Sequence, residues 1–169
     1  MGTKRKIDSN ENPKRKKMKR IALFPGSFDP ITKGHENIVR RAIPLFDEIL
    51  IAIGKNSSKE YMFSSEQRLM WIEKTFIDCS KVKVFNYEGL TIDACKEKNA
   101  NFILRGLRNA NDYEYEKNIA MMNQSMASNI ETVYINTHPE YVAISSTLIR
   151  DIIKNQGNAE PFLASGVQL

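Results

Sequence analysis

The chain has 169 residues, of which 41% are hydrophobic and 27% charged, and its formal net charge is +5. This length and apolar content suit one globular domain with a substantial core. The longest apolar run, residues 49–53, is far shorter than the roughly 20 residues that cross a bilayer, so we expect no membrane span. The charged N-terminus has no apolar segment behind it, which argues against a secretory leader.

The excess positive charge is confined to residues 1–17, which hold seven basic and two acidic residues. Residues 18–169 are therefore balanced, and we expect no nucleic-acid binding by that part of the chain. Residues 1–17 also lack hydrophobic periodicity, which predicts disorder. Their two basic clusters resemble a bipartite nuclear-import signal or a remnant of cloning, and Met18 would make a natural start. We expect a foreign or dispensable extension followed by a single domain over residues 18–169.

The cysteines and histidines are too few to suggest a metal site. Cys79 and Cys95 stand in separate expected elements without CxxC spacing, which indicates free thiols in a reducing cytoplasm. Only His35 and His138 could supply imidazole ligands, so a zinc site is not expected.

The first element expected is a strand over residues 21–24, followed by a loop and by an amphipathic helix over residues 34–45. The unpaired N–H groups of a helix start favour an anion, and this loop delivers the chain to one. Gly26 in the loop lets the backbone approach a ligand closely. His35 lies on the first helical turn. The segment therefore predicts a phosphate site with a polarising histidine.

The rest of the chain alternates strands with helices. Further strands are expected at residues 48–54, 82–85, 102–104 and 132–136. Further helices are expected from Ser64, over 90–97, over 111–127 and from Ser145. Ser64 with Gln67 fits a capping box. The alternation predicts an α/β fold: a single doubly wound, Rossmann-like, five-stranded parallel sheet with helices on both faces.

Polar loops follow four of the expected strands, at residues 25–33, 55–60, 105–108 and 137–146. In a doubly wound sheet, ligands bind beyond the carboxyl ends of the strands, so these loops should meet. The cations in them indicate a phosphorylated ligand. No Ser-His-Asp or paired-carboxylate arrangement suggests covalent catalysis by a side chain.

Two motifs carry a resemblance. TKGH at residues 32–35 matches the T/HxGH pattern of the nucleotidyltransferase superfamily, and ISSTLIR at residues 144–150 matches its ISSTxxR pattern. The segments PGSFDPITKGH, SKEYMF and ILRGLRNANDYEYE narrow the resemblance to bacterial phosphopantetheine adenylyltransferase, from Lys19 to about Leu163. The resemblance implies transfer of the adenylyl group of ATP to 4′-phosphopantetheine with Mg²⁺, giving dephospho-coenzyme A and pyrophosphate. This is the penultimate step of coenzyme A synthesis. It also implies a cytoplasmic homohexamer and no metal held by protein ligands.

The resemblance also assigns residues. His35 should contact the ATP phosphates and stabilise the transition state at the α-phosphorus. Ser27, where many relatives have threonine, should hydrogen-bond both phosphates that must meet. The positions that match acceptor contacts are Ser27, Lys59, Thr91 and Arg105. The positions that match ATP contacts are Ser27, Phe28, His35, Gly106, Leu107, Arg108, Glu116, Tyr141, Val142, Ala143, Ile144, Ser145, Ser146 and Thr147.

Other interpretations stay open. Within the superfamily, a nicotinate-mononucleotide adenylyltransferase or a glycerol-phosphate cytidylyltransferase would differ in its acceptor. A nucleic-acid-binding tail would show steeply salt-dependent affinity, and a non-catalytic module would bind ATP without turnover. Some residues also have simpler explanations: Lys59 alone would be a surface charge, and Asp29 could hold its own loop. The aromatic residues and methionines of residues 113–126 indicate helix packing or a subunit interface.

Overall fold

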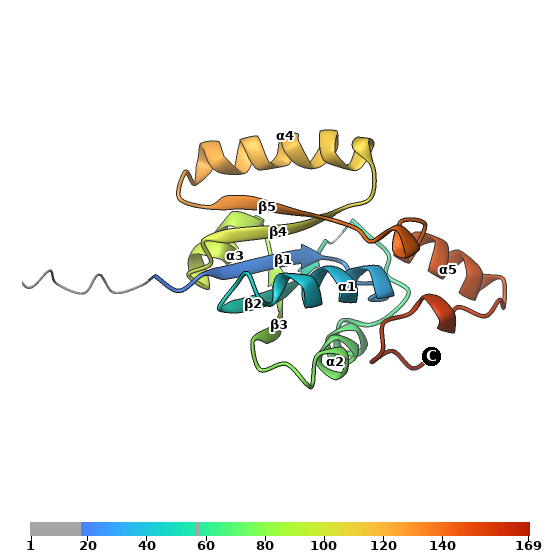
Figure 1. Ribbon diagram of the computed structural model, residues 1–169. Coiled ribbons are helices and arrows are strands. Elements are labelled where there is room, and N and C mark those ends of the chain that lie inside the picture. The colour runs from blue at the N-terminus through green and yellow to red at the C-terminus, as the bar shows by residue number, and fades with distance from the viewer. Residues whose placement is uncertain (1–17, 57) are drawn as a thin grey trace, which may run out of the picture.

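The structure, a computed structural model, describes residues 18–56 and 58–169. The predictions for residues 1–17 lie outside this part. Five strands form one sheet in the order β3-β2-β1-β4-β5, and all neighbouring strands are parallel (Figure 1). The strands are β1 Ile21–Gly26, β2 Glu48–Lys55, β3 Val82–Glu88, β4 Phe102–Leu107 and β5 Glu131–Asn136. The predicted α/β fold with a five-stranded parallel sheet is confirmed.

Helices separate the strands along the chain. They are α1 Lys33–Ala42, α2 Ser65–Thr75, α3 Thr91–Glu97, α4 Ala110–Met126 and α5 Ser146–Lys154, with short 3₁₀ turns η1 Pro139–Tyr141 and η2 Glu160–Phe162. Within the described residues, no helix is both long and apolar enough to cross a membrane.

The core has two parts, one on each face of the sheet. Ile49, Ile51 and Ile53 of β2 pack in a cluster with residues of α1 and α2. Ala52, between them on the strand, packs in a second cluster that includes residues of α3 and the turn after α4. All four residues are fully buried, which explains why β2 is apolar without alternation. Helices therefore cover both faces, as predicted.

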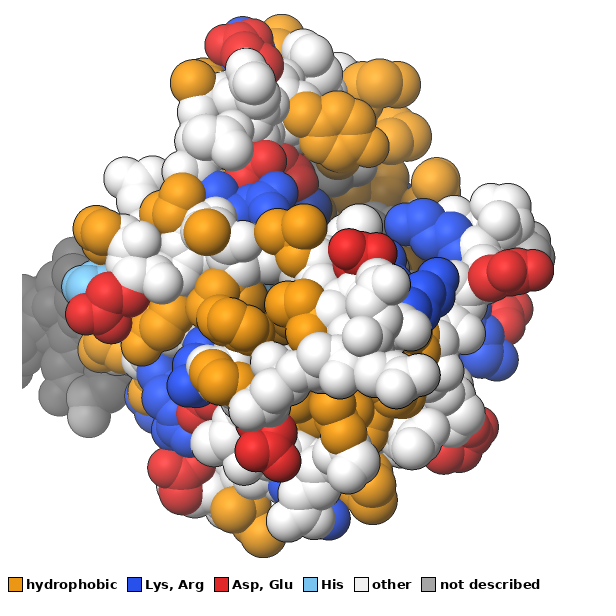
Figure 2. Space-filling model, turned by 90° about the vertical axis from the view of Figure 1, so that its right-hand side faces the viewer, with side chains coloured by type: hydrophobic (Ala, Val, Ile, Leu, Met, Phe, Trp, Pro, Cys, Tyr) orange, Lys and Arg blue, Asp and Glu red, His pale blue; other side chains and the backbone are white. Residues whose placement is uncertain are grey.

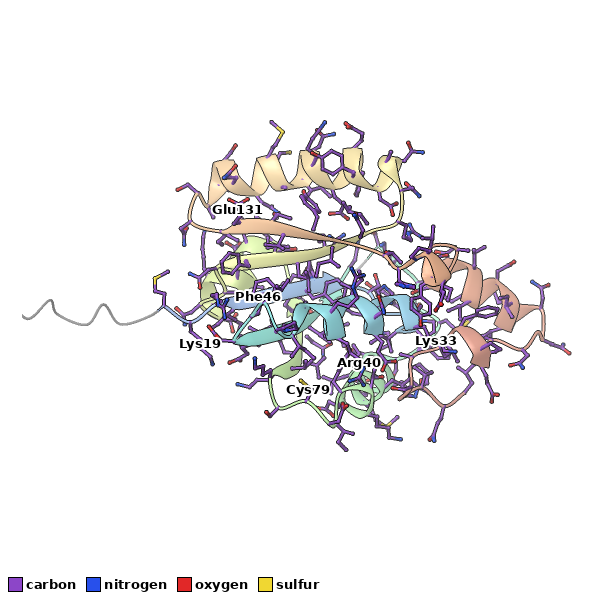
Figure 3. The ribbon with its side chains drawn as sticks, in the orientation of Figure 1. Lys19, Lys33, Arg40, Phe46, Cys79 and Glu131 are labelled. Atoms are coloured by element: carbon purple, nitrogen blue, oxygen red, sulfur yellow. The ribbon has the colours of Figure 1, made fainter. Side chains whose placement is uncertain are left out.

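The strand ends define the edge on which the predicted loops should meet. Lys19, Phe46 and Glu131 mark the side where strands begin, and Lys33 marks the opposite side, where β1 has ended (Figure 3). The order of strands reverses between β1 and β4, because β2 and β3 lie on one side of β1 while β4 and β5 lie on the other. A crevice outside the carboxyl ends of such a pair is the usual ligand site of this fold.

Two local predictions need correction. Residues 105–107 belong to β4 rather than to a loop, because β4 pairs with β5 through Leu107. The reciprocal capping box lies at α1, between Thr32 and His35, whereas Ser64 caps α2 by accepting from the N–H of Gln67 at 3.2 Å. The histidine at N3 of α1 takes the role that glutamate usually has in this motif.

Candidate active site

A cavity of about 950 Å³ opens at the edge where the strands end. Its walls come from the loop after β1, the end of β2 and its loop, β4, α4 and the start of α5. Figure 2 looks onto this side of the molecule, where Lys and Arg side chains lie beside acidic ones. The polar loops that the sequence places after separate strands thus meet at one cavity.

Most of the predicted site residues line this cavity. They are Ser27, Phe28, His35, Lys59, Thr91, Arg105, Gly106, Arg108, Glu116, Tyr141, Ile144, Ser145 and Ser146. The cavity lining does not include four of the described residues predicted to contact ATP, namely Leu107, Val142, Ala143 and Thr147. Thr147 instead accepts a hydrogen bond from Arg150 at 3.2 Å.

The ring of His35 is held by the residue that caps its own helix. Thr32, buried at the N-cap of α1, donates its backbone N–H to Nδ1 of His35 at 3.1 Å and accepts from the His35 N–H through Oγ1 at 3.3 Å. Because Nδ1 accepts a hydrogen bond, the proton of a neutral ring must sit on Nε2. The helix start therefore selects the tautomer that presents an Nε2–H donor.

The surroundings of His35 keep the ring neutral. Burial, the largest cause, and the positive charges of Arg105 and Arg108 together lower the pKa of His35 from 6.5 to about 4. The rings of Phe28 and Phe24 lie edge-on to the imidazole, with centroids 5.2 and 6.3 Å away. Near neutral pH the side chain is thus an uncharged donor beside two cations, a combination that suits a bound phosphate.

The backbone conformation of Ser27 and Phe28 is stabilised by a hydrogen bond from Arg68 and by the packing of the Phe28 ring over Gly26. The Ser27 carbonyl accepts from Nη1 of Arg68 at 2.7 Å, and the buried guanidinium of Arg68 stacks on Tyr61 at 4.1 Å from the ring centroid. Phe28 has a positive φ of 48°, and its ring fills the space over Gly26, where an added Cβ would lie 2.8 Å from it. Sequence reasoning missed Arg68 and Tyr61, since neither belongs to a recognisable phosphate motif.

Asp29 connects three of the predicted motifs. Its carboxylate, 1% exposed, accepts from the backbone N–H groups of Met62 at 2.9 Å and Phe63 at 3.0 Å. Its carbonyl accepts from Nη1 of Arg150 on α5 at 2.6 Å. The expectation that Asp29 holds its own loop is therefore wrong. It fastens the loop that carries Lys59, and the ISSTLIR helix, to the loop after β1.

Arg105 is oriented by a carboxylate from α4. Its Nε donates to Oε2 of Glu116 at 2.7 Å, its Nη2 bonds Oε1, and its Nη1 donates to the Pro25 carbonyl at 2.8 Å. Arg108 forms a similar pair with Asp112, at 2.9 and 3.1 Å. Bidentate pairs of this kind fix the plane of a guanidinium. Asp112 was not predicted, although its position four residues after Arg108 is a signal for such a pair.

The remaining predicted residues come from the loop after β2 and from the starts of α3 and α5. Lys59 lies exposed on the loop after β2. Thr91 begins α3, and its hydroxyl lies 3.0 Å from that of Tyr87. Ser145 caps α5, while Ser146 donates to the Pro30 carbonyl at 2.8 Å. The starts of α1 and α5 therefore meet at the same loop, and both contribute a positive helix end to the cavity.

No metal cage is visible in the described part of the chain: no group of three or more His, Cys, Asp or Glu side chains is placed to hold an ion. The two carboxylates of the cavity, Glu116 and Asp112, are both engaged by arginines.

Comparison with known proteins identifies the class of protein to which this chain belongs. A family model described as cytidylyltransferase-like matches residues 23–152. The fold is shared with the crystal structure of a bifunctional NMN adenylyltransferase/ADP ribose pyrophosphatase from Francisella tularensis, with a TM-score of 0.69 at 18% identity over 89% of this chain. This chain spans 46% of that protein. The protein is thus a nucleotidyltransferase of the cytidylyltransferase-like class.

Relatives at higher identity place the chain more narrowly. A phosphopantetheine adenylyltransferase from Flavobacterium johnsoniae is 54% identical over 150 residues, which cover 89% of this chain and 98% of the relative. Another from Leptospira biflexa is 49% identical over 138 residues, covering 82% of this chain and 86% of the relative. The chain belongs to the phosphopantetheine adenylyltransferase family.

Proposed function

We propose that the protein transfers the adenylyl group of ATP to 4′-phosphopantetheine, forming dephospho-coenzyme A and releasing pyrophosphate. The observation that carries this proposal is the 54% identity to a phosphopantetheine adenylyltransferase over 98% of that relative. The convergence of the TKGH, RGLR and ISSTLIR segments on one cavity supports it.

The reaction requires positioning and charge neutralisation more than covalent help from the protein. A phosphate oxygen of the acceptor attacks the α-phosphorus, and the bond from that phosphorus to the oxygen bridging the α- and β-phosphates breaks, so pyrophosphate leaves with the electron pair. Such transfers are catalysed mainly by in-line placement and by donors aimed at the developing charge. His35 would supply one such donor, its Nε2–H. The ring would donate a hydrogen bond and would not transfer its proton to the substrate.

The other residues divide between the two substrates. Ser27 would hydrogen-bond both phosphates at the point of reaction. Lys59, Thr91 and Arg105 would bind the acceptor. The remaining residues would bind ATP: Phe28, Gly106, Leu107, Arg108, Glu116, Tyr141, Val142, Ala143, Ile144, Ser145, Ser146 and Thr147. In this assignment Glu116 acts through the orientation of Arg105 as well as through the nucleotide.

Mg²⁺ would arrive with the nucleotide. Mg²⁺ is commonly held by substrate phosphates and one or two carboxylates, and the described residues offer no cage of their own. The ion would neutralise phosphate charge, and we assign no protein ligand to it.

The exposed side of α4 supports a homo-oligomer, for which we propose a hexamer. We also propose the cytoplasm as its location, which suits the free thiols of Cys79 and Cys95. Tyr115, Ile119, Met122 and Met126 follow helical spacing and are 67%, 37%, 67% and 49% exposed. We name these four residues the α4 stripe. Hydrophobic side chains of this upper part of the molecule are visible in Figure 2. Tyr115 and Ile119 also line the active-site cavity. Exposed apolar surface of this kind usually marks an interface or a ligand-binding groove.

The decisive experiment measures pyrophosphate release from ATP and Mg²⁺ with different acceptors. We expect turnover with 4′-phosphopantetheine, and none above background with nicotinate mononucleotide. A parallel assay with CTP and glycerol 3-phosphate tests the cytidylyltransferase alternative. Turnover with either rival acceptor at a higher kcat/KM would contradict the proposal. Nucleotide binding without turnover for any acceptor would leave the non-catalytic module as the better explanation.

A further inference from the structure

The chain returns after α5 to touch the helix that carries His35. Leu163 forms an antiparallel bridge with Thr32, and the N–H of Ala164 donates to the Ile31 carbonyl at 3.4 Å. Leu163 and Ala164 are 4% and 3% exposed. This segment, residues 163–166, is named the C-terminal strap. It contacts the backbone of the same Thr32 whose N–H bonds the imidazole.

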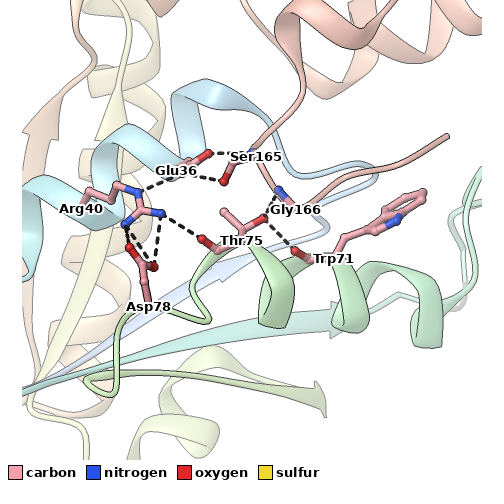
Figure 4. Close-up of polar contacts among 7 residues, drawn as sticks. All are labelled: Glu36, Arg40, Trp71, Thr75, Asp78, Ser165 and Gly166. Carbon is pink, nitrogen blue, oxygen red and sulfur yellow. Dashed lines mark hydrogen bonds and ion pairs between the residues drawn. The ribbon is translucent and has the colours of Figure 1, made fainter.

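The strap also holds the residue that follows His35. Ser165 donates its backbone N–H to Oε2 of Glu36 at 2.9 Å and its hydroxyl to Oε1 at 3.0 Å (Figure 4). Arg40 donates Nε to the same Oε1 at 2.8 Å, which holds the carboxylate in place. The strap thus grips the first turn of α1 at Thr32 and at Glu36, on both sides of His35.

The end of the strap is anchored on α2. The N–H of Gly166 donates to Oγ1 of Thr75 at 3.2 Å, and that hydroxyl donates to the Trp71 carbonyl at 2.7 Å. A Cβ at position 166 would lie 2.3 Å from the Thr75 nitrogen and 2.6 Å from the Trp71 oxygen, so only glycine fits without displacement. Arg40 completes the connection by donating Nη2 to the Thr75 carbonyl at 2.9 Å.

We propose that the C-terminal strap is a positioning element for the proposed adenylyl transfer: by restraining Thr32 and Glu36, it holds His35 in the ring orientation and tautomer that the reaction needs. None of the described residues that line the cavity belongs to the strap or is one of its anchors Glu36 and Thr75. The strap therefore acts through His35 and not by contact with substrate. A displacement of about 1 Å at a reacting group can cost about 10²-fold in rate, so a remote restraint of this kind is large enough to measure.

The test compares three variants of the full-length protein. Gly166→Ala pushes the strap off α2, and Thr75→Val removes the hydroxyl that anchors it. Thr75→Ser keeps that hydroxyl and should restore wild-type behaviour. For the first two variants we expect kcat to fall by about 10-fold or more, because a small displacement of a reacting group can cost up to about 10²-fold in rate. We expect KM for ATP and for 4′-phosphopantetheine to change by less than about 2-fold, because the strap contacts neither ligand.

A matched control separates positioning from general loss of stability. Ile130→Ala removes a buried side chain from the core on the opposite face of the sheet. It should lower the melting temperature without lowering kcat per folded molecule. The proposal is overturned if Gly166→Ala and Thr75→Val lose activity only in proportion to their unfolded fraction, or if Thr75→Ser is as impaired as Thr75→Val.

A second readout needs no substrate. The chain has two histidines, so ¹⁵N spectra of the imidazoles contain two ring systems. In the wild type, His35 should show Nδ1 as an acceptor and Nε2 as protonated, while both strap variants should shift toward a mixture of tautomers. An unchanged His35 spectrum in both variants would overturn the proposal. Absence of turnover by the wild type would overturn only the proposed function, because the spectra would still report on the strap.

Discussion

Helices α1 and α4 both border the active site, but their positions are determined in different ways. The first turn of α1 is held by its capping box, by Arg40 and by the C-terminal strap. By contrast, Glu116 is the one buried residue of α4, and the α4 stripe is exposed, with Tyr115 and Ile119 at the cavity. The phosphate side of the site, at α1, is therefore complete within one chain. The side at α4 depends on the ion pairs of Glu116 with Arg105 and of Asp112 with Arg108 and, by our proposal, on neighbouring subunits.

The largest effect should come from removing the donor on α1. His35→Ala should reduce kcat by about 10²–10³-fold or more, because it deletes a preorganised group aimed at the developing charge. Steady-state pyrophosphate release measures the loss. His138→Ala, in an exposed loop, is the matched control and should keep wild-type turnover. Retention of most activity by His35→Ala would show that α1 is a scaffold and not part of the chemistry.

The burial of the His35 ring on α1 should also affect how the free energy of unfolding depends on pH. The pKa of His35 is about 4 in the folded protein and 6.5 in its ordinary state. Between these values the unfolded chain binds a proton that the folded chain does not, so the free energy of unfolding falls as pH drops from 6.5 to about 4. This shift in the pKa of His35 corresponds to a loss of at most about 3 kcal/mol in the free energy of unfolding.

Urea unfolding of the wild type and of His35→Gln at pH 7.5 and pH 4.5 isolates this contribution. The loss of stability at the lower pH should be smaller in His35→Gln, since carboxylates contribute equally to both proteins. Equal losses would mean that the ring is solvated, and that α1 is held less tightly than its contacts indicate.

The ion pair at α4 should have a smaller effect. Glu116→Gln leaves Arg105 without its bidentate partner, which should lower kcat/KM for 4′-phosphopantetheine by about 10-fold and destabilise the fold by about 1–2 kcal/mol, because the pair is only partly buried. Glu114→Gln, which breaks the exposed pair with Lys117, is the control and should leave both kcat/KM and the free energy of unfolding close to the wild-type values. Similar results for the two variants would mean that α4 does not orient Arg105.

A change on the α4 stripe should alter assembly more than chemistry. Met122→Glu places a charge in the proposed interface and should reduce the molar mass measured by light scattering, with a few-fold change in turnover at most. Ile77→Glu changes another exposed apolar residue, after α2, and should leave the mass unchanged. An unchanged mass for Met122→Glu would place the subunit contacts elsewhere on the surface.

The smallest effect should follow deletion of residues 1–17, which we propose to be dispensable. Their removal should leave kcat and KM within about 2-fold of the full-length values, because the balanced charge of the remaining chain suits a small phosphorylated ligand and not a polyanion. Salt-dependent binding of DNA, if any is seen, should disappear with the deletion. A large loss of turnover would show that this extension takes part in the fold or the site.

Local sequence determined the strand and helix pattern, the sheet class and most of the cavity lining. The reason is that a buried parallel strand such as β2 needs a continuous apolar run, while a phosphate loop needs glycines, hydroxyl groups and a helix start within a few residues. The His35, Arg105 and Ser145 segments carry those requirements in their own sequence. The strand ends then bring these segments to one edge of the sheet.

Only the tertiary structure decided which residues hold those groups in place. Asp29 binds the N–H groups of Met62 and Phe63, Arg68 binds the Ser27 carbonyl, and the C-terminal strap grips α1. Each contact joins residues more than 30 positions apart, and none uses an unusual residue type or a local pattern. Such contacts depend on how the layers pack against one another, and that packing is a property of the whole core rather than of any single segment.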